Sequence, residues 1–128
     1  MAIDYGRRHL GIALSDPSRV IASPLRTVDI ATPEHGIKVA AALAVEWGVT
    51  DLVVGLPRRL CGEEGSMALE VRAWGARLNS ASGIPVHFVD ERLTTAEAEQ
   101  VRHLTKRRMR SDDIAAALVL QVFLEGER

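Results

Sequence analysis

The hydrophobic pattern of the chain changes its period near residue 32, and this change restricts the possible folds more than any other feature. Before it, three short apolar runs (2–4, 10–14 and 20–28) are separated by turns that contain glycine or proline. Short strands joined by tight turns of this kind predict antiparallel hairpins. After it, helical and strand-like periods alternate. The sequence therefore predicts an α/β fold with a mixed sheet flanked by helices.

The elements after this change have their own boundary residues. Thr32 is a good helix N-cap, Pro33 and Glu34 suit the first turn, and glycine ends two of the helices. The predicted elements are a helix over 32–47 that Gly48 ends, a buried strand over 51–55, a helix over 66–78 that Gly83 closes, a buried strand over 86–89, a helix begun by the capping box at 94–97, and a buried helix over 112–124.

Length and composition exclude several classes of protein. The 128 residues, without repeats or a linker-like tract, predict one domain spanning 1–128. A single cysteine, Cys61, excludes an internal disulfide and a zinc site built on paired cysteines. No apolar stretch reaches the roughly 18 residues of a membrane span, so no membrane partner is expected. The first residues lack the order of a signal peptide, so we expect a cytoplasmic protein.

The overall charge argues against a nucleic-acid partner, but the type of basic residue argues for one. The formal net charge is −1, whereas nucleic-acid-binding domains are often strongly basic. Of the 16 basic residues, however, 14 are arginines, which grip phosphate through two hydrogen bonds at once. Genomic base composition would also produce an arginine-rich chain. Charge alone therefore leaves both interpretations open.

Carboxylates stand where the predicted strands end. Asp4 ends the first strand, Asp90 and Glu91 end the last, and Asp112 and Asp113 open the final helix. The carboxyl ends of parallel strands form the ligand crevice of α/β sheets. Carboxylates meeting there would suit Mg²⁺ or Mn²⁺, and two such ions about 4 Å apart can promote phosphodiester hydrolysis. Because side chains alternate along a strand, only one of the adjacent pair should face the site.

Each of these acids also has a purely structural interpretation. Asp4 could start a turn, Asp112 could cap a helix, and the acids at 90–91 could pair with Arg92 on the surface. The remaining strand end, at 55–57, carries no charge and has a glycine that permits close approach of backbone. A strand end without charge that backbone can approach closely favours one shared site for the acids over three unrelated structural roles.

Four motifs follow one another along nearly the whole chain: AIDYGRRHLGIA at 2–13, VVGLP at 53–57, DERLTT at 90–95, and Asp112 followed by 115–116 and 118–121. With these motifs the chain resembles the YqgF (RuvX) family of bacterial nucleases. The resemblance implies an RNase H-like fold with a five-stranded sheet in the order 3-2-1-4-5. It also implies a metal-dependent nuclease that matures the 5′ end of pre-16S ribosomal RNA, similar to Holliday junction resolvases.

The resemblance further implies the residues of the site. The catalytic residues would be Asp4, Glu91 and Asp112, which with Asp90 as the alternative to Glu91 would bind Mg²⁺ or Mn²⁺. Asp113 matches no acid of the family and ranks second. Gly6, Gly55 and Pro57 would line the crevice. Cys61 stands where the family commonly has an acid, which puts a role for that acid in doubt.

Arginines accompany every carboxylate position, so a nuclease would have a positive rim around an acidic centre. The predicted nucleic-acid contacts are Arg7, Arg8, Arg58, Arg59, Arg92, Arg107, Arg108 and Arg110. Contacts of this kind make binding dependent on salt and independent of base sequence. Of the histidines, His9 is a candidate for supporting a metal ligand, and His87 is expected to be structural.

Several alternatives remain at this stage. The triplet at 4–6 also fits an actin-like or sugar-kinase ATPase, but those proteins need two such lobes. A non-catalytic ribosome- or nucleic-acid-binding module is the other class, against which the retained acids argue. The sequence does not decide between structured RNA and branched DNA, and we favour RNA processing on the resemblance alone. Resolving a junction requires two sites related by a two-fold axis, and monomer and homodimer both remain open.

Overall fold

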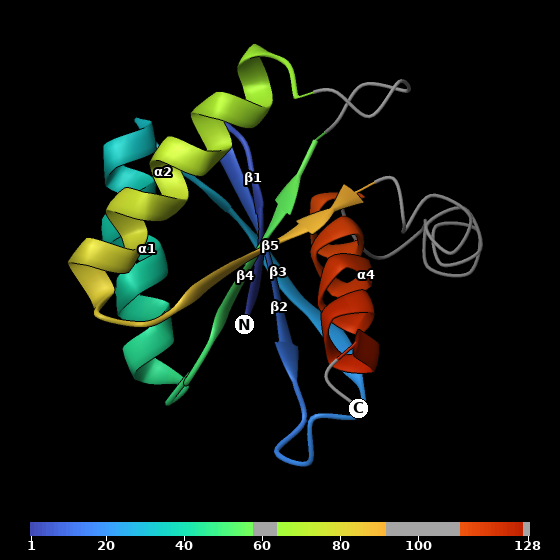
Figure 1. Cartoon of the computed structure of the whole chain (residues 1–128). Helices are drawn as coiled ribbons and strands as arrows, with labels where there is room; N and C mark the ends of the chain where they lie inside the picture. Colours follow the sequence, from blue (N-terminus) through green and yellow to red (C-terminus); the bar gives the residue numbers. More distant parts are fainter. Residues whose placement is uncertain (58–63, 92–110, 127–128) are drawn as a thin grey trace.

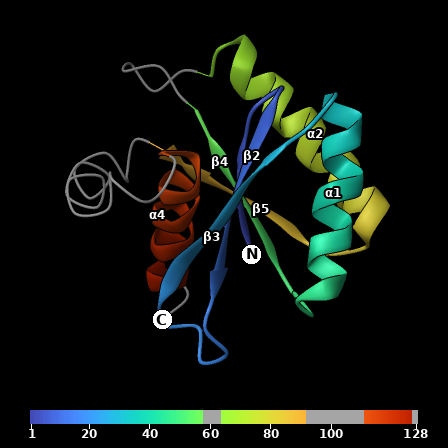
Figure 2. The same cartoon turned by 180° about the vertical axis from the view of Figure 1, so that it is seen from behind.

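One five-stranded sheet separates two layers of helices (Figures 1 and 2). The computed structural model describes residues 1–57, 64–91 and 111–126. The elements are β1 (Ala2–Tyr5), β2 (His9–Ser15), β3 (Ala22–Asp29), α1 (Pro33–Glu46), β4 (Leu52–Leu56), α2 (Ser66–Ser82), β5 (Val86–Asp90) and α4 (Ser111–Gly126). The strand order, β3-β2-β1-β4-β5, confirms the predicted order and the α/β class. The helix predicted from 94–97 lies outside the described residues.

The pairing of the strands brings three strand ends to one edge of the sheet. β1 pairs antiparallel with β2 and parallel with β4, and β4 pairs parallel with β5. The carboxyl ends of β1, β4 and β5 therefore point the same way, and we call this side the carboxyl edge. β2 and β3 form the antiparallel hairpin that the sequence predicts, with a register shift between Ile12 and Ala13.

The two faces of the sheet have different cores. Large side chains such as Ile3, Leu10, Ile12 and Val54 pack under α1 and α2. On the other face, small residues of the sheet meet α4 (Figure 1). Ala2, Ala13 and Val53 of the sheet pack there against Ala116, Ala117, Val119, Leu120 and Leu124 of α4. The small side chains of the sheet let this helix pack directly on it, and its burial confirms the prediction from its apolar sequence.

Local boundary predictions are confirmed at several helix ends. The Thr32 side chain caps α1 by accepting a hydrogen bond of 3.0 Å from the His35 N–H. Gly83 ends α2 in the left-handed conformation, with φ of 71°.

β4 is buried along its whole length, as predicted. β5, expected to be buried, is only half-buried because it is the edge strand of the sheet.

Two apolar groups predicted to be in regular buried positions are exposed. Val20 and Ile21 were expected in the third strand, but that strand begins at Ala22. Their N–H groups both donate to the Asp16 carboxylate at 2.8 Å, which holds them in the turn. Val45 follows the helical spacing of the apolar residues in α1, which favours burial, but it is 81% exposed. None of the helices described in the structure has the length and hydropathy needed to cross a membrane.

Candidate active site

A row of small residues surrounds Asp4 on the sheet face that α4 covers. Asp4 pairs across the antiparallel ladder with Gly11 of β2. On its other side Ile3 pairs with Val54 of β4, so Gly55, one residue further, stands at the level of Asp4. Because side chains on a strand alternate, these positions share the face of Ala2, Ala13 and Val53. Asp4 thus stands between two glycines, whose missing side chains leave room for other groups beside it.

Gly11 provides the space into which the start of α4 descends. A β-carbon at position 11 would lie 2.8 Å from Cβ of Asp112 and closer still to the Asp112 carbonyl group. Only glycine allows this approach of a helix terminus to a strand. Since Gly11 is the partner of Asp4 in the sheet, the contact brings the backbone of Asp112 beside the Asp4 strand.

Gly55 provides the corresponding space for Glu91. A β-carbon at position 55 would lie 2.6 Å from Oε1 of Glu91 and 3.1 Å from Cγ2 of Val119. Glu91 follows β5 directly, and its side chain therefore lies across β4 towards β1. The absence of a side chain at position 55 is what allows Glu91 to reach Asp4.

Asp4 and Glu91 contact each other through a side-chain hydrogen bond. Burial raises the pKa of Glu91 above its usual value of 4.5. The hydrogen bond with Asp4 opposes this effect, and the negative charge of Asp90 adds to it. A bound cation would favour the charged form of both carboxyl groups and so oppose the effect of burial.

Strand alternation separates the two adjacent acids at the end of β5. Phe88 belongs to the core under α1 and α2, whereas Val89 belongs to the core under α4. Asp90 therefore shares the side of Phe88, and Glu91 shares the side of Val89 and Asp4. This arrangement favours Glu91 over Asp90 as the acid that faces Asp4, while Asp90 acts on the pair through its charge.

The third predicted acid is less closely associated with the pair. Asp112 is half-buried in the first turn of α4, and its backbone is the part that contacts Gly11. Within residues 1–57, 64–91 and 111–126, no three His, Cys, Asp or Glu side chains lie close enough together to hold a metal ion. The side chain of Asp113 lies outside what the structure describes.

The chemistry of the donor set nonetheless fits a small hard cation. Mg²⁺ is held in proteins by one or two carboxylates, with water and substrate phosphate oxygens completing its shell. Asp4 and Glu91 supply two carboxyl groups in mutual contact at a strand edge. Their oxygen atoms are the ligand type that Mg²⁺ and Mn²⁺ prefer.

Two of the predicted phosphate-binding arginines are described by the structure, at the turn after β1. Arg7 donates two hydrogen bonds to Glu70 from Nε, at 2.9 and 3.1 Å, and one from Nη2 at 2.6 Å. The side chain of Arg8 is exposed, and its carbonyl accepts a 2.9 Å hydrogen bond from the Ile30 N–H. The other six, Arg58, Arg59, Arg92, Arg107, Arg108 and Arg110, lie outside the described residues, as does Cys61.

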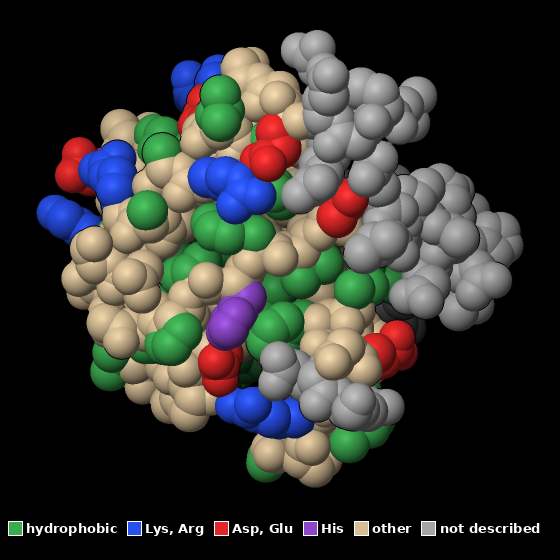
Figure 3. All heavy atoms as spheres, in the orientation of Figure 1, with side chains coloured by type: hydrophobic (Ala, Val, Ile, Leu, Met, Phe, Trp, Pro, Cys, Tyr) green, Lys and Arg blue, Asp and Glu red, His purple; other side chains and the backbone are tan. Residues whose placement is uncertain are grey.

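On the face in Figure 3, the described Lys and Arg side chains are scattered among acidic ones and form no continuous basic rim. The residues predicted to line a crevice stand at strand ends: Gly6 follows β1, and Gly55 and Pro57 stand at the end of β4. A β-carbon at Gly6 would lie 2.9 Å from the His9 carbonyl oxygen, so this glycine keeps the turn tight.

Sequence reasoning missed two residues of this site. Gly11 was included in a motif but given no role, although a glycine inside an apolar strand often marks a close backbone approach. Glu70 was not considered at all. It lies on α2, far from Arg7 in sequence, and no local pattern indicates that the two meet.

Two of the described histidines, His9 and His87, pair with acids. His9 Nδ1 lies 2.7 Å from Asp29 Oδ1 on the surface, and His87 Nε2 lies 3.1 Å from Asp51 Oδ1. The ring of His87 also packs on Phe123, with 4.8 Å between ring centroids. Nothing in these contacts connects His9 to Asp4.

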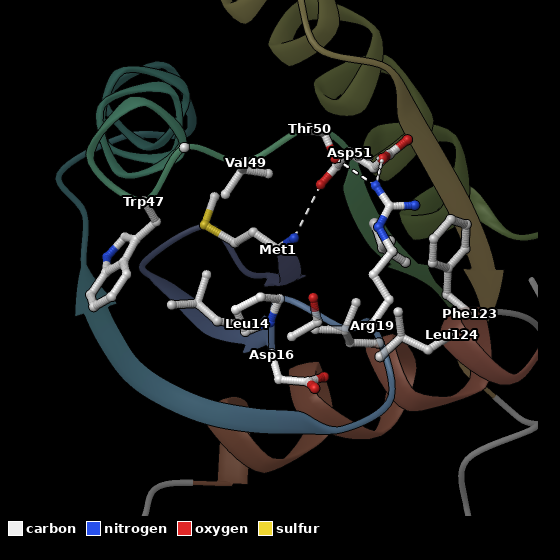
Figure 4. Close-up of a pocket in the computed structure, with 15 residues that line it drawn as sticks. Met1, Leu14, Asp16, Arg19, Trp47, Val49, Thr50, Asp51, Phe123 and Leu124 are labelled. Atoms are coloured by element: carbon white, nitrogen blue, oxygen red, sulfur yellow. Dashed lines mark hydrogen bonds and ion pairs between the residues drawn. The ribbon is translucent and has the colours of Figure 1, made fainter.

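A separate cavity of about 500 Å³ lies at the other end of the sheet, between the β2–β3 turn, the α1–β4 loop and α4 (Figure 4). Its polar groups bind one another. Arg19 donates to Asp51 at 2.8 Å and to Thr50 at 2.6 Å, and the Met1 ammonium donates to the Asp51 carbonyl at 3.0 Å. Arg19 adopts a φ of 60° to make its contacts. These bonds hold the turn against the sheet and leave the cavity walls mainly apolar.

Comparison with known proteins gives consistent results. A family model described as "RuvX: Holliday junction resolvase" matches residues 1–126. A protein of Roseiflexus sp. (strain RS-1) named "Putative pre-16S rRNA nuclease" is 42% identical over 133 aligned residues, covering 100% of this chain and 94% of that protein. A protein of Moorella thermoacetica with the same name is 40% identical, covering 98% and 93%.

Solved structures agree on the fold. Thermus thermophilus RuvC in complex with a Holliday junction substrate superposes with a TM-score of 0.65 at 13% identity, over 98% of this chain and 92% of that one. A further structure of the same protein gives a TM-score of 0.56 at 15% identity. At these identities the likeness concerns the fold alone, and it confirms the predicted RNase H-like fold.

Proposed function

Because the chain belongs to the RuvX family, we propose that it is a nuclease that hydrolyses phosphodiester bonds in the 5′-end maturation of pre-16S rRNA. The observation that carries this proposal is the contact of two carboxyl groups, Asp4 and Glu91, at the carboxyl edge. In this proposal the partner is nucleic acid and the protein acts in the cytoplasm. Residues 1–128 form one nuclease domain.

Mg²⁺ or Mn²⁺ is the cofactor in this proposal, held by Asp4 and Glu91, with Asp112 as a further ligand and Asp90 as the alternative to Glu91. When bound, two such ions supply a nucleophilic water and stabilise the charge that develops on the phosphate. The space at Gly55 lets Glu91 reach Asp4, and the space at Gly11 lets the first turn of α4 lie beside the strand that carries Asp4. Arg7 and Arg8 contribute positive charge at the same edge.

Cleavage of branched DNA is the second candidate activity, which the description of the matching family favours. A four-way junction has two equivalent strands to cut, so its resolution requires two active sites related by a two-fold axis. Maturation of an RNA end requires only one site. A monomer in solution would therefore favour the RNA substrate, and a homodimer would be compatible with either.

Cleavage assays on both substrates test the proposal. A pre-16S 5′-leader RNA and a four-way DNA junction are incubated with the protein and Mg²⁺ or Mn²⁺. We expect the wild type to cut the RNA and Asp4→Asn to cut neither substrate. Glu46→Gln is the matched control, because it also removes one negative charge but lies on the exposed end of α1, away from the carboxyl edge.

The outcomes separate the candidate functions. Cleavage of the junction alone would replace RNA processing by junction resolution. Equal cleavage by wild type and Asp4→Asn would refute the assignment of Asp4. Binding without cleavage of either substrate by the wild type would mean a non-catalytic nucleic-acid-binding module.

A further inference from the structure

Glu70 of α2 joins two residues of the strand end that carries Asp4. Its Oε2 accepts a 2.7 Å hydrogen bond from the Tyr5 hydroxyl and one of 2.9 Å from Arg7 Nε. Its Oε1 accepts a 2.6 Å hydrogen bond from Arg7 Nη2. Tyr5 follows Asp4 directly, and Arg7 is three residues beyond it, so the Cα atoms of Arg7 and Asp4 are within about 11 Å.

The residue that binds Glu70 from β1, Tyr5, is itself held in place by packing. Tyr5 is 8% exposed, and its ring packs on Trp74 with 4.8 Å between centroids. The indole N–H of Trp74 in turn donates a 2.8 Å hydrogen bond to the Pro33 carbonyl. The hydrogen bond from the Tyr5 hydroxyl, with the Tyr5 ring packed on Trp74, thus fixes the position of Glu70 relative to β1.

Glu70 occupies only part of the donor capacity of Arg7. A guanidinium group has five N–H donors in one plane, and the two-pronged bond to Glu70 uses the one on Nε and one on Nη2. The other three have no partner among the residues that the structure describes. The Arg7 side chain is 68% exposed, whereas that of Glu70 is 29% exposed. The guanidinium is therefore fixed along one edge and open to solvent along another.

We propose that Glu70 is a positioning residue that holds the Arg7 guanidinium so that its open edge contacts a backbone phosphate of the bound nucleic acid. This inference rests on the proposed nuclease function. It assigns Glu70 a role in binding substrate although Glu70 is itself negatively charged and does not touch the phosphate.

An inhibitory role, in which Glu70 competes with phosphate for Arg7, fits the structure less well. Both carboxylate oxygens are already bound, and Tyr5 would keep Glu70 in place if Arg7 left. An exposed arginine loses about 2 kcal/mol of rotamer freedom when a ligand fixes it. Because Glu70 has already fixed Arg7, that cost falls on folding rather than on binding.

Nucleic-acid binding without divalent cations tests this role separately from cleavage. The dissociation constant of the pre-16S 5′-leader RNA is measured by fluorescence anisotropy at several salt concentrations for wild type, Glu70→Gln, Arg7→Ala and the double variant. Glu34→Gln is the matched control: it too breaks an acid–arginine pair with α2, the 3.0 Å contact with Arg77, but leaves Arg7 untouched. Thermal unfolding verifies that each variant is folded.

We expect Glu70→Gln to bind the RNA about tenfold more weakly, as for the loss of one charge-assisted hydrogen bond. Arg7→Ala should lower the slope of log K against log salt by about 1, and the double variant should bind like Arg7→Ala. In cleavage assays of Glu70→Gln, KM should rise and kcat should stay constant. Glu34→Gln, which removes a negative charge, should bind as tightly as wild type or slightly more tightly.

Tyr5→Phe provides an independent variant that keeps the aromatic packing and removes one of the hydrogen bonds to Glu70. It should weaken binding less than Glu70→Gln does. Unchanged or tighter binding by Glu70→Gln, or an effect that adds to that of Arg7→Ala, would overturn the positioning role. Absence of RNA binding by the wild type would instead refute the proposed function, and the inference with it.

Discussion

The substitution Gly11→Ala should displace the start of α4 from the sheet. The new β-carbon would lie 2.8 Å from Cβ of Asp112 and closer to its carbonyl group. These atoms cannot rotate away, so the helix must move. Forcing a methyl group into a packed interior costs about 1–3 kcal/mol. Ile114 in the same turn, 1% exposed, would lose part of its burial, and we therefore expect the upper part of that range, about 2–3 kcal/mol.

Urea and thermal unfolding measure this effect. For a chain of this length the expected loss corresponds to an unfolding temperature about 6–12 °C lower. Gly126→Ala is the matched control, because it makes the same change at the last residue of α4, where a β-carbon would meet nothing within 4 Å. It should change stability by less than about 0.5 kcal/mol. An equally small effect of Gly11→Ala would refute the close approach of α4 to β2.

Two further predictions concern the acids of the carboxyl edge. Gly55→Ala would place a β-carbon 2.6 Å from Oε1 of Glu91 and should push this carboxylate away from Asp4. We expect cleavage, measured by kinetics, to be at least about tenfold slower. The loss of stability, measured by unfolding, should be smaller than for Gly11→Ala. The bonds from Arg7, followed by that from the Tyr5 hydroxyl, lower the pKa of Glu70 from 4.5 to about 2. The stability contributed by Glu70 is therefore complete above about pH 4.5 and is lost as the pH falls towards 2. The difference in unfolding temperature between wild type and Glu70→Gln should shrink over that range, and a constant difference would contradict the assignment.

Much of the fold could be predicted because its determinants are local. Thr32 marks a helix start by the chemistry of its own side chain, and Gly83 marks a helix end by a backbone conformation that other residues disfavour. The uninterrupted apolar run of β4 indicates burial on both faces. Such features act within a few residues, so a pattern in the sequence is enough to find them.

The errors arose where burial depends on distant neighbours. β5 is rich in apolar residues like β4, but it stands at the edge of the sheet, and the strand order cannot be read from composition. Val45 has helical spacing, but it lies on the solvent side of α1 and is 81% exposed. Val20 and Ile21 continue an apolar run, yet the hydrogen bonds to Asp16 keep them in a turn.

The acids of the candidate site could be predicted from the sequence, but their arrangement in space could not. Asp4 and Glu91 are recognisable because acids are rare at the ends of apolar strands and match a family motif. The spaces at Gly11 and Gly55 depend on which strands are neighbours and on where α4 lies. The contact of Glu70 with Arg7 joins residues 63 apart in the sequence, and only the folded chain brings them together.

We propose that the Asp4–Glu91 pair, with a divalent cation, forms the catalytic centre. The most direct measurement is the single-turnover rate of cleavage of the pre-16S 5′-leader RNA, with Mg²⁺ and with a chelator, by wild type and by Glu91→Gln. Glutamine keeps the size of the side chain and removes its charge. We predict cleavage by the wild type only with the cation and a rate at least about a hundredfold lower for Glu91→Gln. Equal rates for the two proteins, or undiminished cleavage by the wild type in the chelator, would contradict the claim.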